Sequence, residues 1–374
     1  MLSGRIDRGA YTMTGTRLSC RLLLALGIFC AVLDGHADDA AFEACLKETV
    51  EREALAGMSA AVAINGALRW SGGAGFADVE NEVPMRGDTV HRIASISKPI
   101  AAVGAMLLVQ RGTLSLDDTA RKFVASWPER YPPITLRQLL SHTSGIRHYR
   151  GGEASTMTAY PHMRRALHAF KDDALDAQPG EKYLYTTYGY TLMGAMMEAA
   201  AGERLHPFLK REVWEPAGMV STTFEFAGEL VPRRASGYTR DSKGALRNAP
   251  YTDLSVKYAG GGMISTAEDL VRFGLAFEQG HLVDTATRDS MLERATLNDG
   301  SKTGYGLGWN IGKADTKRSP YSHSGGQAGT STHLAIHPQE GIVIAILCNV
   351  DGAGGAVSAV NRKLLELARK LPLE

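Results

Sequence analysis

The sequence has no surplus of charge of either sign. Among its 374 residues, 41 Lys and Arg stand against 40 Asp and Glu, so the formal net charge is +1. Binding to nucleic acid or to an anionic membrane surface depends on clustered cations, and a balanced chain offers no such field. The composition therefore argues against both kinds of partner.

The sequence also gives no support for a stable membrane span. The N-terminal apolar run, Leu22 to Leu33, is well short of the ~20 residues that a spanning helix needs. Arginines precede this run, and small residues lead to Ala37 before the acidic Asp38. This order is typical of a secretory signal peptide. We therefore predict a signal peptide over residues 1–37, with export to the periplasm or the extracellular space after its cleavage.

Cysteines and metal-binding motifs are scarce. Of the four cysteines, Cys20 and Cys30 fall in the predicted signal peptide, which leaves Cys45 and Cys348. This pair could form a disulfide or remain as two thiols, and the spacing does not decide between them. The sequence contains no C-x-x-C and no H-E-x-x-H, so we expect neither a metal nor a cofactor.

Hydrophobic periodicity predicts helices and hairpins toward both ends of the chain. The expected helices cover residues 40–55, 93–110 and 358–371, and the expected hairpins cover residues 58–70 and 333–348. Residues 114–218 carry mainly helical patterns. This pattern predicts an α/β (α+β) fold, in which a sheet draws its strands from distant parts of the chain. A helical lobe is inserted at roughly residues 114–218.

Three short segments carry residues that could do chemistry. The first, Ser95-Ile96-Ser97-Lys98, places a serine and a lysine on one helical face, where a lysine of lowered pKa could take the serine proton. Roughly one such match is expected by chance, so the motif alone favours a helix start with a solvated lysine. The other two segments are Tyr185-Thr186-Thr187 and, far downstream, His323-Ser324-Gly325-Gly326.

In this order and spacing, the segments resemble the serine β-lactamase-like and penicillin-binding protein family. That family includes class C β-lactamases, D-alanyl-D-alanine carboxypeptidases, esterases and β-lactamase-like peptidases, and shows S-x-x-K, then Y-x-N, then K-T-G or H-x-G. Further resemblance lies in residues 139–145, 261–266 and 305–309. The similarity covers the chain from about Gly57 to Asp351. It implies one domain over residues 38–374, with an antiparallel sheet flanked by N- and C-terminal helices.

The resemblance also implies roles for individual residues. Ser95 would be the nucleophile, with Lys98 and Tyr185 as its proton-transfer partners. The backbone N–H groups of Ser95 and Gly326 would form the oxyanion hole, and the glycines at positions 325 and 326 would let the substrate backbone come close to the strand. A literal K-T-G at Lys302 lies in a polar stretch, and we assign it to a loop.

Two positions depart from the family pattern. Thr187 replaces the usual asparagine, and His323 replaces a lysine that would hold a substrate carboxylate. Both changes favour a serine hydrolase that forms a covalent acyl-enzyme with a peptide, amide or ester over an efficient β-lactamase, with weak β-lactamase activity possible. The alternative is a non-catalytic sensor or binding module, which would be expected to have lost Ser95, Lys98 or Tyr185. The expected partner is a small-molecule or peptide substrate, and the sequence leaves the oligomeric state open.

Overall fold

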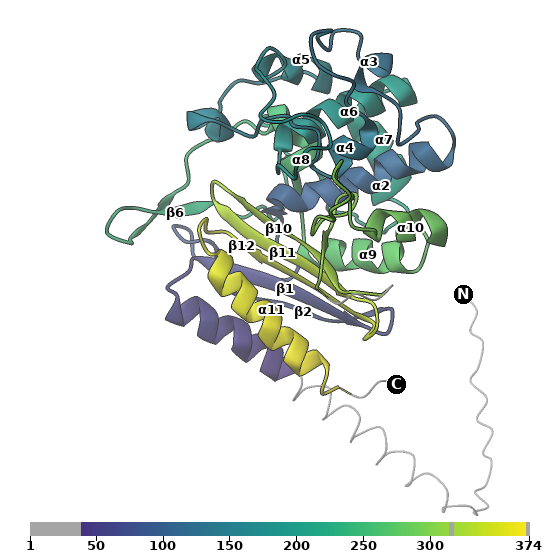
Figure 1. The fold of residues 1–374 in the computed structure, drawn as a ribbon. Helices are drawn as coiled ribbons and strands as arrows, with labels where there is room; N and C mark the ends of the chain where they lie inside the picture. The colour runs from purple at the N-terminus through teal and green to yellow at the C-terminus, as the bar shows by residue number, and fades with distance from the viewer. Residues whose placement is uncertain (1–38, 314–317, 372–374) are drawn as a thin grey trace, which may run out of the picture. The chain divides into compact units, whose positions relative to one another are not determined.

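An antiparallel sheet built from both ends of the chain organises the molecule (Figure 1). The computed structural model describes residues 39–313 and 318–371, so the predicted signal peptide lies outside the described residues. The sheet has the order β3-β2-β1-β12-β11-β10-β9. Its strands are β1 (Gly57–Ile64), β2 (Ala67–Asp78), β3 (Val83–Pro84), β9 (Asn310–Ile311), β10 (Tyr321–Gln327), β11 (Thr330–His337) and β12 (Ile342–Cys348).

Strand β1 pairs with one strand from the N-terminal part of the chain and one from the C-terminal part. It pairs on one edge with its hairpin neighbour β2 and on the other with β12, where Met58 lies opposite Cys348. All eight residues of β1 are buried, because apolar layers cover both faces of the sheet. Alternate residues point to opposite faces, so Ala60 and Val62 enter one core while Ala61 and Ala63 enter the other.

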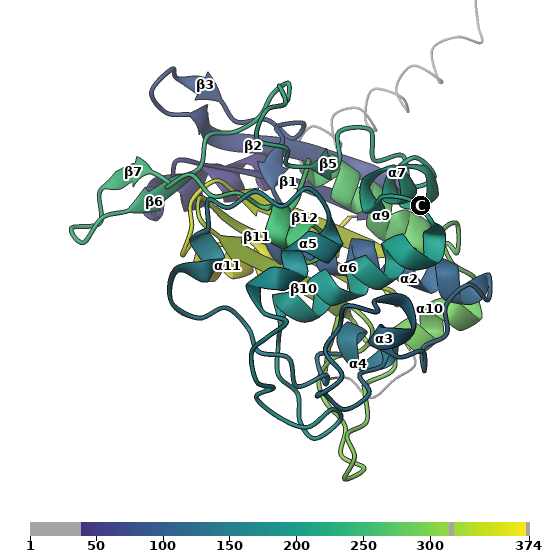
Figure 2. The same ribbon diagram turned by 90° about the horizontal axis from the view of Figure 1, so that it is seen from above.

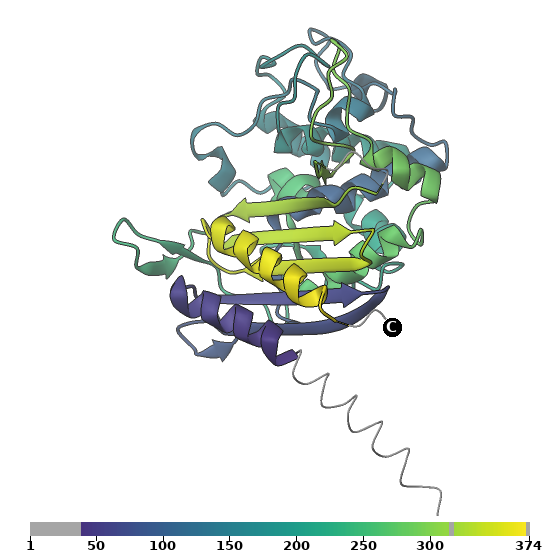
Figure 3. The ribbon, with the colours of Figure 1, turned by 60° about the horizontal axis from the view of Figure 1, so that its bottom comes forward.

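Two helices cover one face of this sheet. Figure 3 shows α11 (Gly354–Ala368) lying beside the helix that ends at residue 52. Phe42 and Leu46 of that first helix share a core with Val357 and Leu364 of α11. The predicted fold class, with a sheet flanked by N- and C-terminal helices, is therefore confirmed.

The opposite face of the sheet carries α9 (Ala267–Glu278), and the longest central helices are α2 (Ser97–Gln110) and α6 (Thr187–Ala201). Within residues 114–218 the structure has α3 (Ala120–Phe123), α4 (Leu136–Leu140), η2 (Gly151–Ser155), α5 (Met163–Ala166), η3 (Leu167–Ala169), α6, α7 (Leu205–Leu209) and the single π turn η4 (Lys210–Trp214). Figure 2 views this helical region from above. The remaining helical elements are η5 (Ser255–Lys257), α8 (Tyr258–Gly261) and α10 (Thr285–Leu292).

Some elements were not expected from the sequence. A small sheet, β4-β8-β5, joins β4 (His91–Arg92), β8 (Met263–Ser265) and β5 (Thr223–Phe224), and β6 (Tyr238–Arg240) forms a hairpin with β7 (Leu246–Asn248). Their strands have only two or three residues, too short to produce a readable alternation. The helix expected over 93–110 also begins later, at Ser97, because residues 94–96 form a separate 3-10 turn, η1.

Candidate active site

Ser95 lies in the tight turn that joins β4 to α2. Ala94, directly before it, is buried and has a positive φ of 47°, a conformation that costs an ordinary residue about 1–2 kcal/mol. The Ser97 hydroxyl donates to the Ala94 carbonyl at 2.7 Å and accepts from the Met263 N–H at 3.2 Å. These bonds stabilise the turn and leave Ser95 partly exposed at the start of the helix.

Lys98 lies one turn further along, and its ammonium nitrogen is enclosed. Nζ lies 3.1 Å from Ser95 Oγ, 3.1 Å from Thr187 Oγ1 and 2.6 Å from the Gly260 carbonyl oxygen. The side chain is 0% exposed. Burial, assisted by the positive charge of Lys257, holds the pKa of Lys98 well below its usual value of 10.5.

Tyr185 and Thr187 are positioned by the start of α6. Between them, Thr186 caps the helix by accepting the Gly189 N–H, and its own N–H donates to His142 Nδ1 at 3.1 Å. The Tyr185 ring packs against His142 in a tilted arrangement, with 4.3 Å between ring centres. The centre of its ring lies 4.7 Å from Lys98 Nζ, and its hydroxyl lies near Ser95. Burial raises the pKa of Tyr185 above its usual value, so the phenol keeps its proton at neutral pH.

Strand β10 approaches the nucleophile turn from the sheet side. A Cβ on Gly325 would lie 2.3 Å from Thr332 Oγ1 and 2.6 Å from the Ile93 carbonyl oxygen. Gly325 is thus needed for packing of the strand against the turn, and it also lines the cavity beside Ser95, where its role toward a substrate stays a prediction. A Cβ on Gly326 would meet nothing within 4 Å, so this residue faces open space beside Ser95.

His323 lies behind the site rather than in it. Its ring is 2% exposed, with Nδ1 2.7 Å from the Ser324 carbonyl oxygen and Nε2 2.9 Å from the Tyr305 hydroxyl. The carbonyl can only accept, so Nδ1 carries the proton and Nε2 accepts from Tyr305. Burial, together with the charge of Lys98, lowers the pKa of His323 to about 3, and the ring is neutral.

The site opens into a cavity of about 560 Å³. Sequence reasoning missed three of its residues, His148, Tyr149 and Lys257, which reach it from loops and short turns that carry no motif. His148 Nδ1 accepts the Thr187 N–H at 3.3 Å. The cavity is lined by Ala94, Ser95, His148, Tyr149, Ala154, Ser155, Tyr185, Thr187, Lys257, Gly260, Gly261, Ser324, Gly325, Gly326, Gln327 and Ala328.

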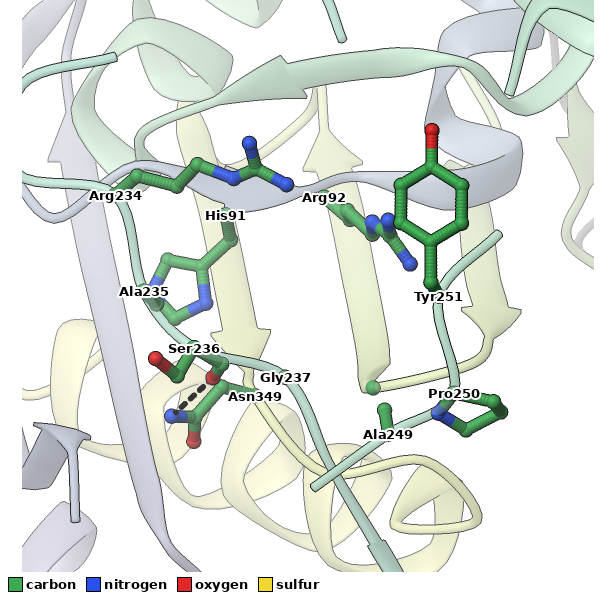
Figure 4. Close-up of a pocket in the computed structure, with 11 residues that line it drawn as sticks. His91, Arg92, Arg234, Ala235, Ser236, Gly237, Ala249, Pro250, Tyr251 and Asn349 are labelled. Carbon is green, nitrogen blue, oxygen red and sulfur yellow. Dashed lines mark hydrogen bonds between the residues drawn. The ribbon is translucent and has the colours of Figure 1, made fainter. Parts of the chain in front are cut away.

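A second cavity, of about 360 Å³, lies beside β4 (Figure 4). Two arginines line it, Arg92 and Arg234, and each donates to Glu225 Oε1 at 2.6 Å. Its only serine, Ser236, has no lysine partner among the described residues. The pairing of a serine with a buried lysine therefore selects the first cavity as the candidate active site.

Other sequence expectations can be compared with the described residues. Cys45 and Cys348 are both buried free thiols, so they form no disulfide. Within residues 39–313 and 318–371, no group of three potential ligands is arranged to hold a metal ion. No helix in these ranges is both long and apolar enough to cross a membrane. Lys302 lies exposed on a loop.

Comparison with known proteins relates this geometry to a family. The model of the β-lactamase family matches residues 42–369. Serine beta-lactamase-like protein LACTB of Homo sapiens is 28% identical over 405 residues, which cover 80% of this chain and 74% of that protein. The octameric penicillin-binding protein homologue from Pyrococcus abyssi is 25% identical, with a TM-score of 0.74 over 87% of this chain and 77% of that one. D-amino acid amidase from Ochrobactrum anthropi has the same fold, at 24% identity, with a TM-score of 0.75 over 88% of this chain and 98% of that one.

The comparison corrects the expected localisation. The LACTB proteins of mouse, human and cattle are mitochondrial, which conflicts with export to the periplasm or the extracellular space. The expectation rested on the charge and hydropathy of residues 1–37, and a basic, acid-poor N-terminus with an apolar run does not by itself distinguish export from other destinations.

The family resemblance of the three motifs is confirmed by the family match, which spans most of the described residues. The solved relatives carry the same arrangement of sheet and helices. The protein belongs to the β-lactamase family and is a hydrolase of the type related to penicillin-binding proteins.

Proposed function

We propose that this protein hydrolyses peptides, amides or esters through a covalent acyl-enzyme formed at Ser95. The observation that carries the proposal is the environment of Lys98 Nζ, which has three oxygen neighbours and no water-exposed surface. A serine next to a lysine of lowered pKa is an activated nucleophile.

The three neighbours of Nζ suit both protonation states of the lysine. A neutral amine donates its two protons to the Gly260 carbonyl and the Thr187 hydroxyl, and its lone pair then faces the Ser95 O–H. When Ser95 Oγ attacks a substrate carbonyl, the serine proton moves to Nζ, and the new ammonium donates to all three oxygens. The proton can therefore be taken and returned with little rearrangement.

Tyr185 is suited to deliver a proton. Because its raised pKa keeps the phenol protonated, Tyr185 can give its proton to the departing group of the tetrahedral intermediate, and the proton that Lys98 took from Ser95 then replaces it. The N–H groups of Ser95 and Gly326 would stabilise the oxyanion, a contribution of roughly 3–4 kcal/mol per donor in related sites.

A non-catalytic binding module on the same fold is the alternative. It does not require an activated serine, so covalent labelling separates the two functions. We expect a fluorophosphonate probe to label the wild-type protein, and peptide mapping to find the label on Ser95. Ser95→Ala should lose labelling, while Ser155→Ala, which removes another serine of the same cavity, should keep it. Label on any other serine, or none, contradicts the proposed function.

The substrate preference follows from the walls of the cavity. β-Lactams present a carboxylate on the leaving-group side, but His323 is neutral and enclosed, and Thr187 offers one hydroxyl in place of an amide. Losing a charged contact and weakening a neutral hydrogen bond predict a deficit of roughly two to three orders of magnitude in kcat/KM. We therefore expect ready cleavage of p-nitrophenyl butyrate and poor cleavage of a chromogenic cephalosporin. Fast cephalosporin turnover would overturn this preference.

A further inference from the structure

Lys257 is a buried cation in the wall of the catalytic cavity. It ends the 3-10 turn η5 and is only 3% exposed. Its Nζ donates to the Ala154 carbonyl at 3.0 Å and lies 5.5 Å from the centre of the Tyr149 ring. An ammonium group can donate three hydrogen bonds, so one carbonyl leaves donor capacity directed at the surroundings.

No carboxylate of the described residues balances this charge by an ion pair. The charged groups around it come from four other segments: Lys98 of α2, Arg92 of β4, His148 and Glu225. Glu225 is already bound by Arg92 and Arg234, and no Asp or Glu lines the cavity. A buried ammonium without an anionic partner is unfavourable, and an anionic ligand would relieve that cost.

The position of Lys257 indicates which part of a substrate would carry the anion. The cavity has one wall formed by Gly325 and Gly326 of β10, and another formed by Thr187 with α8. Lys257 belongs to the second wall, because its Cδ lies near Gly261, and the neighbouring Gly260 packs on Thr187. In the family that the motifs resemble, the asparagine replaced by Thr187 contacts the acyl-amide side chain of the substrate, whereas the usual lysine of the third motif holds the carboxylate on the leaving-group side.

We propose that Lys257 binds a carboxylate on the acyl part of the substrate, so that the enzyme prefers acyl groups carrying an acidic side chain or terminus. This inference rests on the proposed function, because an acyl group is defined only relative to Ser95. Strand β10 has His323 where the family motif has a lysine. Lys257 supplies a cation in its place, but on the acyl side of the scissile bond rather than on the leaving-group side.

The charge state of Lys257 makes the preference dependent on pH. Burial and the charge of Arg92 lower the pKa of Lys257 to about 8, so the ammonium predominates at pH 7. The preference for an acidic acyl group should therefore be present below about pH 8 and decline above it.

Arylboronic acids provide a test in which the ligand carrying the carboxylate is bound by the enzyme but not hydrolysed. The boron atom forms a bond to a nucleophilic serine oxygen, and its substituent occupies the position of the acyl group. The measurement is the Ki of 3- and 4-carboxyphenylboronic acid against p-nitrophenyl butyrate hydrolysis, each compared with the matching carboxamide. We expect at least one carboxylate to bind about tenfold to a hundredfold more tightly than its carboxamide, the range for a charged hydrogen bond.

Substitutions test whether Lys257 is the residue that causes the preference for a carboxylate over a carboxamide. Lys257→Met should reduce the carboxylate preference to about onefold, and Lys257→Arg should retain a preference that no longer declines near pH 8. Lys302→Met, which removes an exposed lysine elsewhere, should keep the wild-type ratio. Equal binding of each acid and its amide by the wild type, or a preference that survives in Lys257→Met, overturns the role of Lys257. Failure of every boronic acid to inhibit overturns the proposed nucleophile, and the inference with it.

Discussion

At the scale of single residues, the candidate site depends on a lysine whose pKa is lowered by folding. Lys98 is enclosed by Ser95, Thr187 and Gly260, and burial lowers its pKa in the folded chain. In the unfolded chain the same side chain is solvated and takes a proton up to its usual pKa of 10.5. At neutral pH the unfolded state therefore binds more protons at this position, so Lys98 opposes folding.

The sign of this linkage gives a prediction for Lys98→Met. Where the folded pKa is lowered, the wild type gains stability as the pH rises toward 10.5, while the variant has no such group. The free energy of unfolding of the variant minus that of the wild type should therefore decrease between pH 7 and pH 9.5. Urea denaturation at the two pH values measures it, with Lys302→Met as the baseline. A difference that does not change with pH would contradict a lowered pKa at Lys98.

Single residues also mark the limit of prediction from sequence. Ser95, Lys98, Tyr185 and Thr187 are close together in the structure, and motif order was enough to select all four. The sequence could not show that the ring of His323 turns away from the cavity, because that depends on contacts with Tyr305, which lies outside the motif.

Lys257 illustrates the opposite case. It is separated from Ser95 by more than 160 residues and belongs to no recognised motif, so nothing in the sequence singled it out. Its importance is visible only from burial in the cavity wall and from the absence of an acidic partner among the described residues. The roles of all these residues remain predictions until they are tested by substitution.

At the scale of elements, the nucleophile turn is supported by strands that meet it from several directions. The Thr332 hydroxyl of β11 donates to the Ile93 carbonyl at 3.0 Å, directly before the strained Ala94. On β4, Arg92 donates to both oxygens of Glu225, at 2.7 and 2.6 Å, and Arg234 shares that carboxylate. Glu225 thus ties β4 to the segment that follows β5.

Removing the Glu225 carboxylate should lower the free energy of unfolding. The side chain of Glu225 is 5% exposed, and Glu225→Gln would leave two partly buried arginines without a counter-charge. Breaking a buried pair from one side typically costs about 3–5 kcal/mol. Thermal or urea denaturation should show that loss, whereas Glu340→Gln, which breaks a more exposed pair with Arg369, should cost at most about 1 kcal/mol. Similar losses in the two variants would show that Glu225 does not have this structural role.

At the scale of the whole molecule, element type was more predictable than element position. Continuous apolar runs in β1 and β12 and the helical period of α11 indicated both ends of the sheet, because such patterns are visible within a single segment. The three-stranded sheet around β4 could not be predicted, since its strands are held by long-range pairing such as His91 with Ser265. The local sequence of β4 does not indicate which distant strand it pairs with.

The pairing of β1 with β12 has a consequence for synthesis of the chain. About 280 residues separate the two strands, so at roughly 5–20 residues per second β12 leaves the ribosome about 15–60 s after β1. During that interval one edge of a largely apolar strand has no neighbour, which is the kind of surface that aggregates. We therefore expect the nascent β1–β2 hairpin to be prone to aggregation until β12 has been made. If Ser95 and Gly326 form the site as proposed, the nascent chain is also inactive, since Ser95 is made long before the strand that carries Gly326.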